Sequence, residues 1–390
     1  MDRYKSFFRG IAYAGYCIVF LFAVYTFEKS IPDQIYVKAG EAIDYRFQVP
    51  VTMEIQEDSS PVAKSTNNAN VRQSYIVTCR LFGIFPVKDI EVVLVDGDAV
   101  YAGGMPIGIY VKTRGVLVIG TSEVERPDGS EAAPAENILK AGDYILSVNG
   151  EKVAEKEDLQ RLVQQNGAEK EILKINRKGE EVEVGVTPVQ NKNGTYMLGA
   201  WVRDDLAGIG TLTYYKEDGT YGALGHAVSD GDVGERIQMR EGYVYNAQII
   251  GVKKGQKGNP GELSGMIRYQ SADCLGTIEE NTDIGIYGKL DGNIAALPRG
   301  DYYNICYKQD IKQGPATIIC GFTGEKKEYA IEIESLDYSG DEENKGILFK
   351  VTDERLLDLT GGIVQGMSGS PILQNGRLVG AVTHVLVNDP

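Results

Sequence analysis

A glycine-rich stretch near the C-terminus carries the residue types that acyl transfer requires. Residues 361–372 read Gly-Gly-Ile-Val-Gln-Gly-Met-Ser-Gly-Ser-Pro-Ile, so Ser368 lies between glycines and Ser370 follows two positions later. A nucleophilic serine needs backbone N–H groups turned toward the substrate carbonyl, and glycine permits the dihedral angles of such a turn. We predict Ser368 as the nucleophile and the N–H groups of Gly366 and Ser368 as the oxyanion hole. The alternative is an ordinary Gly-Ser-Pro turn between two strands.

A serine hydroxyl is a weak nucleophile at neutral pH, so a base must accept its proton during attack. The chain has two histidines, His226 and His384, and histidine is the side chain that titrates nearest neutral pH. His226 ends an apolar stretch beside a turn and precedes the serine, which is the order found in the chymotrypsin class. We therefore predict His226 as the base. His384 lies in an alternating strand after the serine, where a structural or surface role is favoured.

A carboxylate commonly holds such a histidine in the correct tautomer and stabilises the imidazolium. The residues alone leave several carboxylates in competition. Asp230 lies four residues after His226, a position that also suits a turn cap. The complete set of candidates is Asp230, Asp283, Asp291, Asp353 and Asp358.

Four motifs together resemble the stage IV sporulation protein B peptidases of endospore-forming bacteria. They are Leu-Gly-His-Ala-Val-Ser-Asp at 224–230, Gly-Glu-Leu at 261–263, Asn-Thr-Asp-Ile-Gly-Ile at 281–286, and the serine loop. The resemblance runs from the N-terminal apolar segment to residue 390. It implies a serine peptidase with a chymotrypsin-like double β-barrel, in which His226 is the base, Ser368 the nucleophile and Asp353 the acid. An acid so close to the serine departs from the usual chymotrypsin placing.

The resemblance also implies a biological role. Members of this family cleave themselves and a membrane protein partner that restrains an intramembrane protease, which in turn activates a late sigma factor during sporulation. We therefore expect a membrane-anchored serine endopeptidase in the space between the forespore and mother-cell membranes. The competing interpretation is a non-catalytic PDZ scaffold with a protease-like domain, although both the serine and the histidine are present.

Composition limits the other classes of function. The net charge of −15 disfavours nucleic acid as a partner. Abundant glycine and tyrosine suit many short strands with frequent turns, so we expect a mainly β protein. The two histidines are far apart and the chain has no HExxH or paired-cysteine motif, so we expect no metal and no cofactor. The five scattered cysteines predict free thiols, and none lies in a glycine-rich turn.

The first 30 residues predict a cytosolic stub and a signal anchor. Basic residues precede an uncharged apolar run over 10–27, which is just long enough for a transmembrane helix, and a charged Glu-Lys pair follows immediately. The basic flank should stay in the cytosol and the rest of the chain should lie outside it. Residues 31–103 alternate apolar and polar side chains in several runs, which predicts a β-rich spacer.

Residues 104–190 resemble a PDZ domain. The sequence Pro106-Ile107-Gly108-Ile109 matches the loop that offers backbone N–H groups to a peptide carboxylate in PDZ folds. A helical segment around 157–165 supplies Leu159 and Val163 as the groove wall. We predict that a peptide, from a partner or from the chain itself, binds this groove by β-augmentation.

Residues 196–390 predict the peptidase domain. About ten strand-like runs alternate with short turns and show almost no helical periodicity, which indicates a barrel or double barrel. Residues 353–359 are the exception and predict a short helix shortly before the serine loop.

Overall fold

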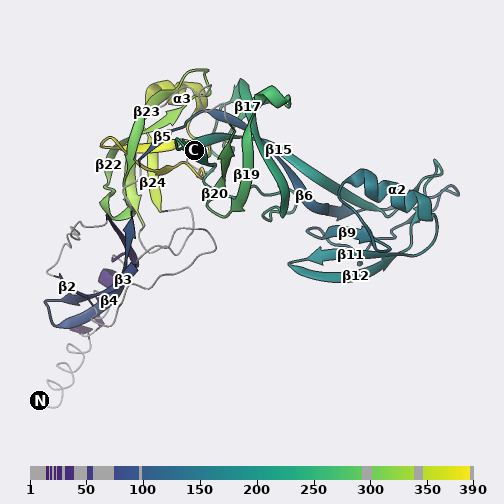
Figure 1. The fold of residues 1–390 in the computed structure, drawn as a ribbon, viewed down its shortest axis with the longest axis horizontal. Helices are drawn as coiled ribbons and strands as arrows, with labels where there is room; N and C mark the ends of the chain where they lie inside the picture. The colour runs from purple at the N-terminus through teal and green to yellow at the C-terminus, as the bar shows by residue number, and fades with distance from the viewer. Residues whose placement is uncertain are drawn as a thin grey trace, which may run out of the picture.

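The computed structural model describes residues 15–16, 18–19, 22, 24–28, 31–38, 51–55, 74–95, 99–291, 301–337 and 346–386. The described chain is mainly β, as predicted (Figure 1). The predicted anchor over 10–27 lies largely outside the described residues. In the described part of the chain, no helix combines the length and the apolar character needed to cross a membrane.

A small N-terminal sheet lies at one end of the molecule (Figure 1). Its strands run in the order β1-β4-β3-β2, and β1 is parallel to β4. They are β1 (Gln34–Lys38), β2 (Val51–Ile55), β3 (Ser74–Leu81) and β4 (Phe85–Val95). The strands bury alternate side chains, among them Ile35, Ile90 and Val92, in a core of their own. The alternation seen in the sequence therefore reflects a sheet with one buried face.

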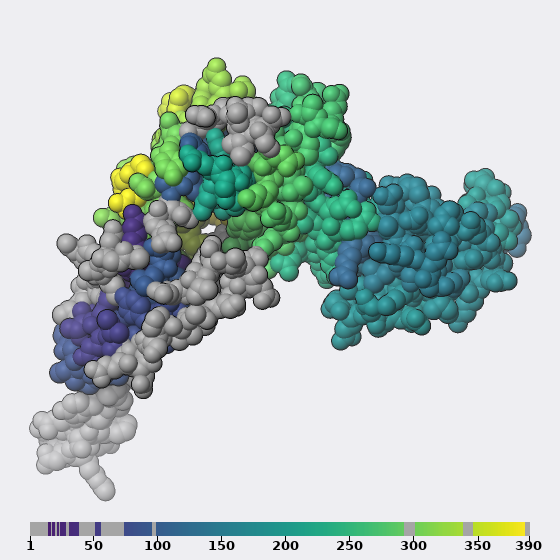
Figure 2. Space-filling model, viewed as in Figure 1, coloured from purple at the N-terminus to yellow at the C-terminus, as the bar shows by residue number. Residues whose placement is uncertain are grey.

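Two long antiparallel strands connect the other two parts of the molecule. β6 (Pro106–Thr121) pairs with β15 (Ala200–Tyr215) along almost its whole length, from Thr121 opposite Ala200 to Pro106 opposite Thr211. One end of this ribbon enters the PDZ unit and the other enters the peptidase core (Figure 1). Figure 2 shows the PDZ unit as a lobe that projects from the rest.

The PDZ unit packs one helix and a sheet around a core of its own. Helix α2 (Lys156–Asn166) begins with a capping box between Glu155 and Asp158 and buries Leu159 and Val163. Its strands are β7 (Val124–Glu125), β8 (Glu131–Ala132), β9 (Tyr144–Val148), β10 (Glu151–Lys152), β11 (Glu171–Arg177), β12 (Glu180–Val186), β13 (Val189–Gln190) and β14 (Tyr196–Met197).

The predicted carboxylate-binding loop at Pro106-Ile107-Gly108-Ile109 is wrong. These residues lie inside strand β6, between β15 on one edge and β17 (Met239–Lys253) on the other. Their backbone N–H and C=O groups already pair with β15 and β17, so no peptide strand can add to them. Gly108 also packs against Ile267, which lies 2.5 Å from where a Cβ would stand.

The peptidase segment forms a hydrogen-bonded strand system that closes on itself and encloses two large apolar cores. One core is built mainly from residues 107–290 and the other mainly from residues 306–382. The double barrel of chymotrypsin type stays a prediction. Besides β15 and β17, the strands are β5 (Ala99–Ala102), β16 (Thr220–Ala223), β18 (Glu262–Ile267), β19 (Cys274–Thr282), β20 (Gly285–Leu290), β21 (Tyr302–Ile305), β22 (Gly314–Cys320), β23 (Lys327–Leu336), β24 (Ile347–Val351), β25 (Pro371–Gln374) and β26 (Arg377–Ala381).

Among the described residues, three short helical segments interrupt these strands. Two are 3-10 turns, η1 (Ser271–Asp273) and η3 (Lys308–Asp310). The third is α3 (Glu354–Thr360), which confirms the helix predicted shortly before the serine loop. The four cysteines of the described chain, Cys79, Cys274, Cys306 and Cys320, are free thiols.

Candidate active site

The serine loop connects α3 to β25 and separates the two candidate nucleophiles. Ser368 is half-buried, and its hydroxyl donates a hydrogen bond to the carbonyl oxygen of Thr383 at 3.1 Å. Ser370 is 1% exposed and accepts a hydrogen bond from the Cys320 thiol at 3.6 Å. Only Ser368 is therefore accessible to a substrate.

Two glycines shape this loop. Gly366 and Gly369 have φ angles of 96° and 97°, in the region that glycine adopts without strain. Gly369 also lies so close to β15 that a Cβ would come within 2.1 Å of the Thr211 carbonyl oxygen. A larger residue at position 369 would push the serine away from β15.

The loop offers two backbone donors for an oxyanion. In the part of the chain that the structure describes, neither the Gly366 N–H nor the Ser368 N–H donates a hydrogen bond. Their neighbours are all satisfied, because the N–H groups of Met367, Gly369 and Ser370 donate to backbone carbonyls. An oxyanion hole requires backbone donors that are not already used, and these two N–H groups meet that condition.

His226 follows β16 and carries its proton on the nitrogen that general-base catalysis requires. Its Nδ1 lies 2.8 Å from the carbonyl oxygen of Ala227. A carbonyl oxygen only accepts, so Nδ1 must donate and Nε2 remains an acceptor for a serine proton. A backbone carbonyl thus fixes the tautomer, a task that carboxylates perform in other serine peptidases.

The loop after His226 is held by two side chains. Asn281 of β19 accepts a hydrogen bond from the Val228 N–H at 2.8 Å and donates to the carbonyl oxygens of Val228 and Ile237. Asp230 is buried, pairs with Arg203 of β15, and accepts the N–H groups of the turn that follows. Asp230 is therefore a turn cap rather than a partner of the histidine ring. The sequence motif contained Asn281 but gave no sign of its clamping role.

The second histidine lies at the same site. The rings of His226 and His384 have their centroids 5.9 Å apart, and His384 is exposed. Thr383, immediately before it, approaches both halves of the site. Its carbonyl accepts the Ser368 hydroxyl, and its methyl group lies 2.7 Å from where a Cβ on Gly225 would stand. The sequence favoured a structural or surface role for His384 and did not reveal this proximity.

Asp353 makes no hydrogen bond to His226 among the described residues. It caps α3 by accepting the Arg355 N–H at 3.0 Å, and it accepts the Ala330 N–H at 3.1 Å. The Arg355 guanidinium contacts the same carboxylate at 2.7 Å. These hydrogen bonds hold the pKa of the Asp353 carboxyl well below its usual range. The structure thus brings Ser368 and His226 to one site but directs Asp353 toward α3 and β23.

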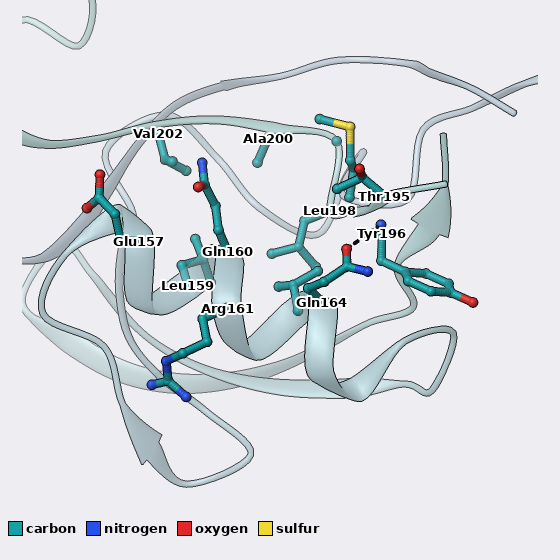
Figure 3. A pocket seen from close by; sticks show the side chains of 13 residues that line it. Glu157, Leu159, Gln160, Arg161, Gln164, Thr195, Tyr196, Leu198, Ala200 and Val202 are labelled. Carbon is teal, nitrogen blue, oxygen red and sulfur yellow. Dashed lines mark hydrogen bonds between the residues drawn. The ribbon is translucent and has the colours of Figure 1, made fainter. Parts of the chain in front are cut away.

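A groove runs along helix α2 on the PDZ unit. It has a volume of about 530 Å³. Leu159, Gln160 and Gln164 face Leu198, Ala200 and Val202 across it (Figure 3). Gln164 also accepts the Tyr196 N–H at 3.0 Å. Leu159 and Val163, both predicted as groove wall, do line this groove.

The strand that borders the groove is the start of β15, not β6. Residues 200–203 pair with β6 on one edge and have no strand on the other edge within the described chain. Residues 197–200, which lead into this edge, read Met-Leu-Gly-Ala and so have the same apolar-Gly-apolar pattern as residues 106–109. The groove therefore has a free strand edge, a helix and a glycine turn, which are the parts that β-augmentation uses.

A half-buried serine on a glycine turn, beside a histidine with a free acceptor nitrogen, is the arrangement of a serine peptidase. Here it is joined to a PDZ unit. The SpoIVB peptidase S55 family matches residues 194–390, slightly more than half of the chain. A PDZ domain family matches residues 127–177. The chain therefore belongs to the SpoIVB peptidase S55 family.

Other comparisons add little to this assignment. The PDZ domain of an SdrC-like protein from Listeria monocytogenes aligns with 24% of this chain and 90% of its own length. The two are 18% identical, with a TM-score of 0.20. No curated protein matches the chain.

Proposed function

We propose that the protein is a serine endopeptidase in which Ser368 attacks a peptide carbonyl and His226 accepts the serine proton. The supporting observation is the pair of unpaired N–H groups, on Gly366 and Ser368, beside a serine that is open to substrate. These donors stabilise the negative oxygen of the tetrahedral intermediate. His226 then protonates the leaving amine, and water releases the acyl group by the same steps in reverse.

The first step requires a small rearrangement of the serine. In the resting structure the Ser368 hydroxyl donates to the Thr383 carbonyl. During attack it must turn toward Nε2 of His226, which the Ala227 carbonyl has left free to accept. A serine hydroxyl changes direction by rotation about one side-chain bond between staggered positions.

The proposal extends to where the enzyme acts and what it cleaves. The protein is a membrane-anchored, extracytoplasmic enzyme that cleaves itself and a membrane protein partner to trigger sigma-factor activation during sporulation. Membership of the SpoIVB peptidase family and the apolar run at 10–27 support it. The groove along α2 would take an extended peptide, either from the partner or from the chain itself.

The test is labelling of the purified chain with a fluorophosphonate probe, together with mass spectrometry of self-cleavage fragments. Wild type should be labelled on Ser368 and should release fragments, whereas Ser368→Ala should do neither. Ser370→Ala is the matched control and should keep both activities. His226→Ala should lose about 10⁴-fold in rate. Labelling on Ser370, or fragments from Ser368→Ala, would contradict the proposal. A scaffold would bind peptide without any labelling.

A further inference from the structure

A hollow lined by basic residues lies where the PDZ unit meets the peptidase core. Its volume is about 470 Å³, within the range of small-molecule sites. Lys152 of β10 and Lys174 of β11 come from the PDZ sheet, while Arg114 of β6 and Arg240 of β17 come from the connecting strands. No acidic residue lines the hollow. Four cations therefore converge on one space in a chain whose net charge is −15.

The charges of these cations are only partly neutralised. Lys174 pairs with Glu181 at 2.6 Å, and Arg240 lies 3.8 Å from Glu155 and 3.5 Å from Glu241. Arg114 and Lys152 have no ion-pair partner among the described residues. The hollow thus keeps two positive charges without an ion pair, Arg114 of β6 and Lys152 of β10, although Glu181 lies near enough to Arg114 to feel its charge.

A buried donor without a hydrogen bond is a second feature of this hollow. The Arg240 Nη1 donates to the Ala154 carbonyl at 3.2 Å, whereas its buried Nε makes no hydrogen bond and has the Glu241 carboxylate 3.5 Å away. An unsatisfied buried donor of this kind costs free energy unless an acceptor reaches it. A guanidinium donates two parallel hydrogen bonds to two oxygens of one phosphate or carboxylate group.

We propose that this hollow binds a phosphate-type anion, which bridges the PDZ sheet and the base of the peptidase core. The shared chemistry is a compact group of anionic oxygens, whether on a free phosphate compound or on a lipid headgroup. The lysines supply point charges and the arginines supply paired donors, while Leu146 and Val153 close the apolar floor. This binding does not depend on the peptidase activity. Its consequence is mechanical, because an anion held from both walls ties the PDZ unit to β6 and β17.

The experiment measures binding of inorganic pyrophosphate to the full chain by isothermal titration calorimetry. In a parallel arm, vesicles of phosphatidylglycerol and phosphatidylcholine are compared with vesicles of phosphatidylcholine alone. The test variant is Arg114→Gln/Lys152→Gln. The control variant is Lys178→Gln/Lys257→Gln, which has the same net charge and removes two exposed lysines away from the hollow. Thermal melting checks that both variants are folded.

Wild type and the control should bind pyrophosphate equally, at one site. The Arg114→Gln/Lys152→Gln variant should bind at least about 10-fold more weakly, since each hydrogen bond to a charged group contributes about that much. A second outcome is that wild type binds phosphatidylglycerol vesicles but not pyrophosphate, and that the Arg114→Gln/Lys152→Gln variant loses the vesicle binding. This outcome would identify a lipid headgroup as the anion. The proposal would be overturned if the test and control variants lost anion binding to the same extent. It would also be overturned if wild type bound neither pyrophosphate nor phosphatidylglycerol vesicles.

Discussion

At the scale of single residues, Thr211 connects the two halves of the active site. Its N–H donates to the Ser368 carbonyl at 3.0 Å, and its hydroxyl donates to the Gly366 carbonyl at 2.9 Å. Its own carbonyl accepts the Leu224 N–H, two residues before His226. Thr211 is 4% exposed, so these bonds are shielded from water. One residue of β15 thereby fixes the position of the nucleophile loop relative to the histidine.

Replacement of Thr211 by valine tests this positioning role. Valine keeps the shape and the backbone bonds but leaves the buried Gly366 carbonyl without its donor, which costs about 1–3 kcal/mol. We expect fluorophosphonate labelling of Ser368 to slow by about tenfold or more. Thr213→Val is the control, because Thr213 is also buried in β15 but its hydroxyl makes no hydrogen bond in the described chain. Equal rates in the two variants would show that the Thr211 hydroxyl does not position the loop.

Asp353 is a second residue whose role the structure alters. Its folded pKa is depressed, so its ion pair and cap stabilise the protein above pH about 4 and lose that effect as the pH falls below it. Asp353→Ala should cost about 1 kcal/mol of stability at pH 7, as loss of a helix cap does, and Asp353→Asn should cost less because asparagine also caps. The gap between wild type and Asp353→Ala should close in acid.

Chemical denaturation at several pH values measures this gap, with Ser368 labelling as the second readout. If Asp353 acts only at α3, labelling of the folded Asp353→Asn variant stays close to wild type. A fall of about 10⁴-fold in that variant would instead assign Asp353 to the histidine, as the family resemblance implies. Release of the carboxylate from Arg355 would then have to precede catalysis.

At the scale of elements, the sequence predicted local structure well and long-range pairing poorly. The glycine-flanked serine, helix α3 and the groove-facing side of α2 follow from local patterns, and the structure contains all three. The pattern Pro106-Ile-Gly-Ile109 was misread because the same four letters suit a loop or a strand. Its partners, β15 and β17, are more than 95 residues away, so only the fold decides between the two.

The same limit explains which site residues could not be predicted. Ser368 and His226 are the candidates that their own neighbours in the sequence single out. Thr211 lies in an alternating strand, and the sequence predicts the same for His384, although the structure ends β26 at Ala381. Nothing local distinguishes either residue from ordinary strand residues. Their roles come from contacts with segments distant in the chain, for example between the two histidine rings. Such contacts depend on how the strand system closes, which no short window of sequence encodes.

At the scale of the whole molecule, strand β15 links the PDZ groove to the loops that carry His226 and Ser368. Its first residues form the free edge of the PDZ groove. Arg203 then pairs with Asp230 and Asp232 in the loop that follows His226. Thr211, eight residues and so about 26 Å further along at roughly 3.3 Å per residue, holds the serine loop. A change in the order or twist of this strand therefore reaches both catalytic loops.

We expect a peptide in the groove to accelerate labelling of Ser368. A peptide that adds to the edge at Ala200 would order the start of β15, and with it Arg203, which anchors the histidine loop. Coupling between distant sites typically amounts to about 5-fold or more.

The measurement is the labelling rate with and without saturating peptide, in wild type and in Ala200→Trp, whose indole fills the groove. Trp201→Ala is the control, since Trp201 is 64% exposed and does not line the groove. Peptide that binds wild type yet leaves the labelling rate unchanged would mean that β15 joins the two parts without coupling them.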